Sequence, residues 1–265
     1  MKRIVITGAS GTAGSLIRPL LRARHQLTLY TRARVDLAHN EVGIVGALDD
    51  SAALARAFAG ADAIVHLAGI SIEGDFHPMI DTNIRGTHQV LEAARAAGVR
   101  RVLVASSGHA VGGTPIERAY GLRPEETDPS SFYGASKVAV EAIARVHAHK
   151  YRMSVVIARI GTILAEPLTQ RHLSTWLSPG DMVRLIDATL ALDRSGAWTV
   201  WAVSANARRW VDLAPGQAIG YVPQDNSEAF APTLLADPAD ASLQWDTLGG
   251  PWYGPAKEHR WPNAV

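Results

Sequence analysis

Short apolar runs alternate with longer segments of helical period along the first 160 residues. Most of the runs are apolar at consecutive positions, which predicts buried strands. The predicted strands cover residues 3–7, 26–30, 41–45, 63–67, 101–105 and 154–159. The segments between them space apolar residues three and four apart, which predicts helices at 14–24, 51–58, 81–97 and 132–149. Strands that are apolar on both faces and separated by helices indicate an α/β fold with a doubly wound parallel sheet.

After residue 160 this alternation weakens. Ser178, Pro179 and Asp181 combine an N-cap, a proline at the first helical position and an acid, so they predict a helix that continues through 182–192. A further strand is predicted at 198–202, and loops with short helices from Trp210 onward. We expect residues 161–265 to form a small C-terminal lobe packed on residues 1–160 as one unit. It would cover the carboxyl ends of the strands, where open α/β sheets bind ligands.

Three glycines, Gly8, Gly11 and Gly14, separate the first predicted strand from the first predicted helix. Such a turn lets a pyrophosphate approach the backbone, and the helix N-terminus supplies unpaired N–H groups and a positive dipole end. The alternative is a purely structural turn. We predict that residues 1–160 form a Rossmann-type dinucleotide-binding domain, with Thr12 and Ala13 also at the cofactor.

The end of the second predicted strand bears on the choice of cofactor. Enzymes that use NAD commonly place Asp or Glu there, on the ribose 2′-hydroxyl. This chain has Arg32 and Arg34 instead, and a guanidinium suits the 2′-phosphate of NADP. We therefore predict NADP, held by Arg32. The alternative is NAD, with both arginines solvated in a loop.

Tyr133 and Lys137 stand four apart on a predicted helix, so they share one face. A free tyrosine titrates near ~10, and a neighbouring ammonium can lower that pKa and make the phenol a proton acceptor. Ser106 and Ser107 follow the fifth predicted strand, where a hydroxyl can hold the reacting oxygen. The alternative is that these serines merely end the strand. We predict a nicotinamide-dependent oxidoreductase that uses Tyr133, Lys137 and Ser107.

Composition excludes several other classes. The formal net charge of +1 gives no bulk reason to expect nucleic-acid or anionic-membrane partners. The chain has no cysteine, and its histidines lack the His-Glu-x-x-His spacing, so no metal site is predicted. No stretch approaches the ~18 apolar residues that cross a bilayer. We expect a cytoplasmic protein that self-associates as a homo-oligomer.

Taken together, these motifs resemble the extended short-chain dehydrogenase/reductase family. The glycine triplet, His66-Leu67-Ala68-Gly69, Asn83, Ala105-Ser106-Ser107 and the Tyr133/Lys137 pair stand in that family's order. Within it, the similarity to the uronate dehydrogenase branch runs through nearly the whole chain. It is carried by residues 69–73, 106–109, 159–162, 171–176 and 220–230, of which 171–176 is the most specific segment.

This resemblance implies oxidation of the C1 hydroxyl of a cyclic hexuronate to a lactone. Tyr133 would take the hydroxyl proton, and Lys137 would hold the nicotinamide ribose. Arg171 would pair with the substrate carboxylate, which suits its planar fork. The other implied substrate residues are Ser71, Ser107, Gly108, His109 and Thr162. The other implied cofactor residues are Leu48, Leu67, Ala68, Gly69 and Thr162.

The chain also departs from the family pattern. Gly108 stands where the family has asparagine on the substrate, Arg32 replaces the acidic ribose ligand, and Ala47 replaces an aspartate near adenine. Rival functions therefore remain open: an NADP-dependent dehydrogenase of a neutral aldose, a carbonyl reductase, or a non-catalytic NAD(P) sensor. A sensor would tend to lack the tyrosine or lysine. A sugar-nucleotide epimerase is disfavoured because the C-terminal region is short for a nucleoside diphosphate.

Overall fold

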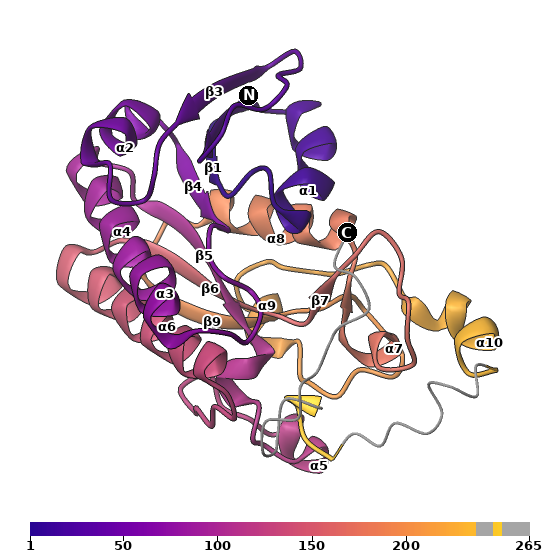
Figure 1. Ribbon diagram of the computed structural model, residues 1–265. Coiled ribbons are helices and arrows are strands. Elements are labelled where there is room, and N and C mark those ends of the chain that lie inside the picture. Colours follow the sequence, from indigo (N-terminus) through magenta and orange to yellow (C-terminus); the bar gives the residue numbers. More distant parts are fainter. Residues whose placement is uncertain (237–245, 251–265) are drawn as a thin grey trace.

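Seven parallel strands form the central sheet of the computed structural model, which describes residues 1–236 and 246–250 (Figure 1). Their order is β3-β2-β1-β4-β5-β6-β9, so the direction of winding reverses between β1 and β4. The bounds are β1 Arg3–Thr7, β2 Gln26–Thr31, β3 Glu41–Val45, β4 Ala63–His66, β5 Arg101–Ser107, β6 Ser154–Ile160 and β9 Gly196–Ala202. Such a reversal opens a crevice at the carboxyl ends of the strands. The predicted Rossmann-type doubly wound fold is confirmed.

Helices cover both faces of the sheet, and the strands are apolar on both sides for that reason. In β1, Ile4 and Ile6 join the apolar cluster under α1 (Thr12–Arg22) and α8 (Pro179–Ala191). Val5, between them, joins the opposite cluster under α2 (Ser51–Phe58), α4 (Gly86–Ala96) and α6 (Phe132–Tyr151). Figure 1 shows α2, α4 and α6 together on one side of the sheet.

Two of the predicted helices differ from those observed. The segment expected as one helix at 81–97 instead comprises α3 (Phe76–Met79), a π-helix (Ile80–Arg85) and α4. The helix expected at 14–24 is observed as α1 at Thr12–Arg22, and its apolar Leu20 is 43% exposed. The buried side of α1 is formed by Gly14, Ile17 and Leu21.

The predicted helix start at Ser178 is confirmed, because the Ser178 hydroxyl accepts a hydrogen bond from the Asp181 N–H at 2.9 Å. The resulting helix α8 lies beside α1, and β9 pairs with β6. Two elements of the expected C-terminal lobe thus belong to the central layers, while the domain boundary at residue 160 stays a prediction.

Short elements fill the rest of the described C-terminal region, and those after Trp210 agree with the loops and short helices predicted there. They are β7 (Thr162–Ile163), which pairs with β8 (Trp176–Leu177), and the helices α7 (His172–Thr175), α9 (Ala214–Gln217), η3 (Ser227–Phe230) and α10 (Ala231–Leu234). Upstream, η2 (Gly108–Val111) and α5 (Ile116–Ala119) follow β5. The remainder of the predicted lobe, 237–245 and 251–265, lies outside the described residues. Among the helices of the described ranges, none has the length and apolar character to span a membrane.

Candidate active site

A cleft of about 1070 Å³ opens at the carboxyl ends of β1 to β4, on the winding reversal. It is lined by seven of the predicted cofactor residues: Gly8, Gly11, Arg32, Leu48, Leu67, Ala68 and Gly69. Sequence reasoning did not assign its other walls, among them Ser10, Tyr30, Thr31 and Asp49. Their only sequence signal is that they stand at or just after strand ends.

Two of the three glycines are required by backbone packing. Gly8 has φ +72°, and a Cβ there would stand 2.7 Å from the backbone nitrogen of Ala68. A Cβ at Gly14 would stand 2.6 Å from the Cα of Ala9. Gly11 is the N-cap of α1, and no side chain caps that terminus. Unpaired N–H groups beside a roomy cleft fit a bound pyrophosphate.

Arg32 lies at the rim of this cleft, in the turn that follows β2. The Thr31 hydroxyl donates to the Ala33 carbonyl at 2.7 Å, which shapes the turn. At the end of the same strand, the buried Tyr30 hydroxyl donates to the carbonyl of Ala47, which follows β3, at 2.6 Å and fixes that wall. Burial raises the pKa of Tyr30 to about 12, so its hydroxyl keeps its proton. The cleft wall therefore presents a guanidinium next to the predicted ribose position.

The three predicted catalytic side chains converge where β5 ends against the N-terminal half of α6. Ser107 is the last residue of β5, and its side chain hydrogen-bonds that of Tyr133. The Lys137 ammonium donates to the Ala105 carbonyl at 3.0 Å. It also lies beside Gly69 of the cleft wall, because a Cβ on Gly69 would stand 3.6 Å from Nζ.

The start of α6 is anchored from a distant loop. The N-cap Ser131 accepts from the Gly134 N–H, and the Glu73 carboxylate accepts from the N–H groups of Phe132 and Tyr133, at 3.2 and 2.9 Å. An acid at a helix N-terminus also interacts favourably with the helix dipole. Glu73 thereby fixes the position of Tyr133. It precedes the helix by almost 60 residues, so sequence reasoning had no local signal for it.

The pKa values of the catalytic pair differ from the sequence-based expectation. Burial raises the pKa of Tyr133 to about 12, with the Ser107 hydrogen bond acting the other way. Burial lowers the pKa of Lys137 to about 8, opposed by the charge of Glu141. Lys137 Nζ lies 5.6 Å from the Tyr133 ring centroid and does not offset the desolvation of the phenolate. The positively charged nicotinamide ring of a bound cofactor would then be the group that acidifies the tyrosine.

Two predicted substrate residues, His109 and Arg171, join this cluster. The His109 ring packs edge-on against Tyr133, with centroids 5.6 Å apart. Burial and the nearby charge of Arg171 lower the pKa of His109 to about 3, so the ring is neutral. Arg171 stacks on Trp210 and donates to the Leu248 carbonyl. A guanidinium next to His109 is a suitable partner for a carboxylate.

The remaining predicted residues are placed less centrally. Ser71 stands on the exposed loop after β4. The Thr162 hydroxyl is 3.1 Å from that of Thr175 and does not line the cleft. Gly108 faces Trp201, 3.4 Å from the position of a Cβ. Thr12, Ala13 and Gly14 begin α1 behind the cleft wall. The roles of these residues remain predictions.

Asn83, quoted above only as part of the family pattern, clamps the loop after β4 to α6. Its amide nitrogen donates to the Ile70 carbonyl and the Ser136 hydroxyl, at 3.0 and 2.9 Å, and its oxygen accepts from the Ile70 N–H at 2.8 Å. All three contacts are made from the π-helical segment. Ile70 lines the cleft, so Asn83 holds part of the cleft wall against the catalytic helix.

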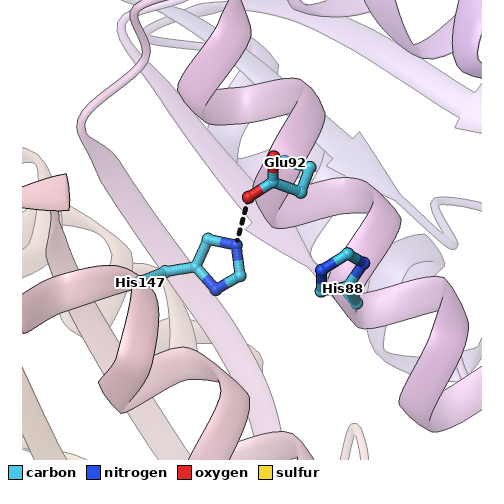
Figure 2. A group of neighbouring side chains, drawn as sticks. All are labelled: His88, Glu92 and His147. Carbon is cyan, nitrogen blue, oxygen red and sulfur yellow. Dashed lines mark hydrogen bonds and ion pairs between the residues drawn. The ribbon is translucent and has the colours of Figure 1, made fainter. Parts of the chain in front are cut away.

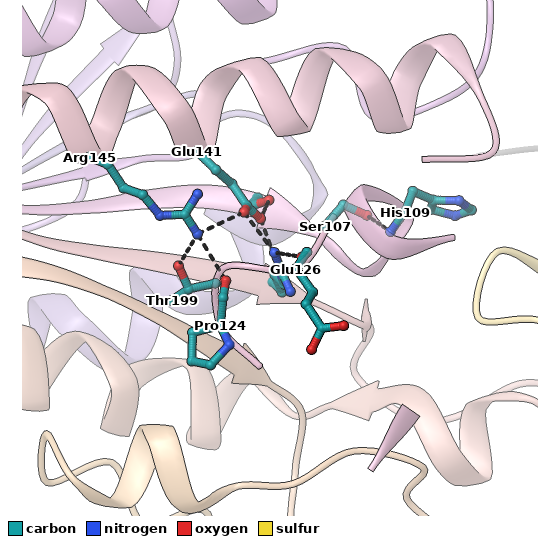
Figure 3. Close-up of polar contacts among 9 residues, drawn as sticks. Ser107, His109, Pro124, Glu126, Glu141, Arg145 and Thr199 are labelled. Carbon is teal, nitrogen blue, oxygen red and sulfur yellow. Dashed lines mark hydrogen bonds and ion pairs between the residues drawn. The ribbon is translucent and has the colours of Figure 1, made fainter. Parts of the chain in front are cut away.

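Glu141 was also missed, although helical spacing places it one turn beyond Lys137. Its buried carboxylate accepts from the Ser106 hydroxyl at 2.7 Å and from the Arg159 guanidinium at 2.8 and 2.9 Å. Figure 3 shows this network continuing through Arg145 to Thr199 and Pro124, a short distance from Ser107. The network ties α6 to the ends of β5 and β6.

Comparisons with known proteins agree with this geometry. The model of the NAD dependent epimerase/dehydratase family matches residues 4–211. A uronate dehydrogenase of Agrobacterium fabrum is 37% identical over 253 residues, covering 92% of this chain and 95% of the relative. A mutant of the Agrobacterium tumefaciens uronate dehydrogenase, solved in complex with NAD, superposes with a TM-score of 0.87 at 36% identity, covering 96% and 98% of the two chains. An L-arabinose 1-dehydrogenase (NAD(P)⁺) of Haloferax volcanii is 32% identical, covering 86% and 98%.

A Rossmann-type sheet with this cleft and a tyrosine–lysine pair defines a nicotinamide-dependent oxidoreductase, and the enzyme class predicted from the sequence is confirmed. The chain belongs to the NAD dependent epimerase/dehydratase family, the extended short-chain dehydrogenases/reductases.

Proposed function

We propose that this protein oxidises the C1 hydroxyl of a cyclic sugar acid, a hexuronate, to the corresponding lactone. The observation that carries the proposal is the single cluster formed by Ser107, Tyr133, His109 and the half-buried Arg171. The cluster would set a proton acceptor, Tyr133, near the positive charge of Arg171. A substrate that carries both a hydroxyl to be oxidised and a carboxylate would use both groups. The uronate dehydrogenases to which the chain is similar support the same substrate class.

The reaction balances as a two-electron oxidation. The C1 hydroxyl proton passes to the oxygen of Tyr133 in its phenolate form, the C1–H bond breaks, and C1 becomes a carbonyl carbon within the ring. A bound nicotinamide dinucleotide would supply the hydride acceptor. Ser107 would hold the reacting oxygen, because its hydroxyl already hydrogen-bonds the Tyr133 side chain. Neutral His109 can orient a sugar hydroxyl as donor or acceptor without adding a charge beside Arg171.

For the cofactor we propose NADP in preference to NAD. The exposed Arg32 guanidinium lines the cleft where β2 ends, the position at which a 2′-phosphate would meet the protein. Relatives differ on this point: one uronate dehydrogenase was solved with NAD, whereas the arabinose enzyme is named for both cofactors.

A neutral aldose is the second candidate substrate, and the L-arabinose 1-dehydrogenase similarity favours it. The two candidates make different demands on Arg171. A substrate with a carboxylate would pair with the positive charge of Arg171, whereas a neutral sugar would not need that charge.

The test is an activity panel with a product assay. Purified protein is mixed with NAD or NADP and with galacturonate, glucuronate, L-arabinose or glucose, and reduced nicotinamide is followed by absorbance. We expect turnover with a hexuronate, and NMR of the product should show a lactone before it hydrolyses. Turnover with aldoses alone would replace the proposed substrate, and no turnover with any sugar would remove the proposal.

A further inference from the structure

Three side chains able to bind a metal meet between α4 and α6, and the proposed chemistry uses none of them, although His88 also lines the cofactor cleft. His88 and Glu92 lie four residues apart on one face of α4, and His147 approaches from α6 (Figure 2). One ligand atom of each residue lies within 4.8 Å of the other two. His147 follows Lys137 by ten residues, about 15 Å along the helix axis.

The hydrogen bond made by Nδ1 of His147 leaves the lone pair of Nε2 available to a proton or a metal ion. Nδ1 lies 2.9 Å from the Ile143 carbonyl, which can only accept, so Nδ1 carries a hydrogen. In the neutral ring, Nε2 then presents a lone pair to the Glu92 carboxylate oxygen, 3.0 Å away. Two acceptors at this distance need a cation between them, either a proton or a metal. A histidine whose second nitrogen donates to a carbonyl is the usual arrangement of a metal ligand.

Glu92 is oriented for the same task. Arg95 donates to its Oε2 at 2.8 and 3.2 Å, which leaves Oε1 directed at His147. These hydrogen bonds lower the pKa of Glu92, so the carboxylate is charged at neutral pH. The Arg95 charge also opposes a bound cation, so the affinity should be moderate.

We propose that His88, Glu92 and His147 bind a divalent transition metal such as Zn²⁺ and join α4 to α6. Zinc holds nitrogen and oxygen ligands at about 2.0–2.2 Å, so the ligand atoms must draw closer than they are. His147 is buried and fixed, whereas His88 is exposed, so His88 is the ligand that turns to close the site. Water would complete the coordination. The sequence did not reveal the site because its third ligand lies 55 residues from the second.

The experiment is a Zn²⁺ titration of the chelator-treated full chain at pH 7.5, by calorimetry and by thermal unfolding. We expect one ion per chain at micromolar concentration and a Tm that rises by several degrees. His88→Ala should weaken binding at least ten-fold, and because His88 is exposed the fold should be unaffected. His149→Ala is the matched control, because His149 is exposed on α6 two residues from His147 and should bind zinc as the parent does.

Absence of saturable binding below about 100 µM, or equal affinity in His88→Ala and the parent, would overturn the site. In either case the Glu92–His147 contact would be an ion pair between helices only. His147→Gln gives a second check: it should abolish tight binding while circular dichroism shows a folded chain. Tight zinc binding by that folded variant would also count against the proposal.

Discussion

The carboxylate of Glu141 on α6 accepts two hydrogen bonds from the guanidinium of Arg159 on β6, at 2.8 and 2.9 Å, and both side chains are buried. Ser106, next to the proposed catalytic Ser107, donates to the same carboxylate. Lys137 lies one helical turn away, within reach of its charge. This ion pair therefore fixes the catalytic helix against the strand ends and also influences the protonation of the active-site lysine.

Replacing Glu141 with glutamine should affect both stability and pH dependence. Breaking one partner of a buried pair leaves Arg159 uncompensated, so the free energy of unfolding should fall by about 3 kcal/mol. The Glu141 charge raises the pKa of Lys137, so its loss should move the alkaline limb of the kcat profile to lower pH. Urea unfolding and a pH–rate profile measure the two effects. Glu125→Gln, at an exposed position, is the control, and an unmoved alkaline limb would exclude the coupling to Lys137.

Lys137 itself should give the protein a distinctive dependence of stability on pH. Its pKa is about 8 when folded, against an ordinary value of 10.5. Between these values the unfolded chain binds a proton that the folded chain does not, so stability rises with pH. From pH 8 to 10 the parent should gain about 2 kcal/mol relative to Lys137→Met. Denaturant curves at both pH values test this, and parallel behaviour of the two proteins would contradict it.

Tyr133→Phe should remove activity without removing the cofactor. The ring still packs against His109, but no oxygen remains to take the proton, so kcat should fall by about 10²–10⁴-fold. Tryptophan fluorescence should show unchanged dinucleotide affinity. Tyr120→Phe changes an exposed tyrosine and should behave as the parent. Full activity in Tyr133→Phe would refute the proposed role of this residue.

Arg32→Ala should weaken NADP binding while affecting NAD much less. One or two charge-assisted hydrogen bonds to a phosphate amount to roughly 10–100-fold in affinity. Titration of both cofactors by fluorescence measures the difference. Arg34→Ala serves as the comparison, since Arg34 does not line the cleft. If the parent binds NAD more tightly than NADP, the cofactor assignment is wrong.

Arg171→Met should separate acidic from neutral substrates. The side chain keeps similar length but loses the charge, so kcat/KM for a hexuronate should drop about 100-fold, as expected for a lost charge-assisted pair. Turnover of a neutral aldose, where detectable, should change far less. The ratio of the two specificity constants is the measurement, because it cancels any shared loss from the disturbed Trp210 contact. An equal decline for both sugars would argue against a carboxylate contact.

Strands and helices were predictable from the sequence where their apolar residues follow a regular spacing along the chain. In β1, for example, consecutive residues point to the two apolar clusters on opposite faces of the sheet. The π-helix was not, and the contacts that Asn83 makes from it reach Ile70 and Ser136, 13 and 53 residues away in the sequence. In the site, the Tyr133/Lys137 spacing is local and was recognised. The Glu73 anchor joins segments some 60 residues apart, so no sequence window contained it.

The π-helical turn at Ile80–Arg85 sets the rotation of everything downstream on the same helix. Omitting one residue there would permit an unbroken α-helix, yet it would swing the following residues by about 100°. The side chains of Val90 and Leu91 would then turn away from the apolar cluster under the sheet. His88 and Glu92 would no longer face His147. One irregular turn thus lets Asn83 hold the loop at Ile70 while Val90 and Leu91 pack in the core and His88 and Glu92 face His147. A regular helix could not place all of these side chains in this way.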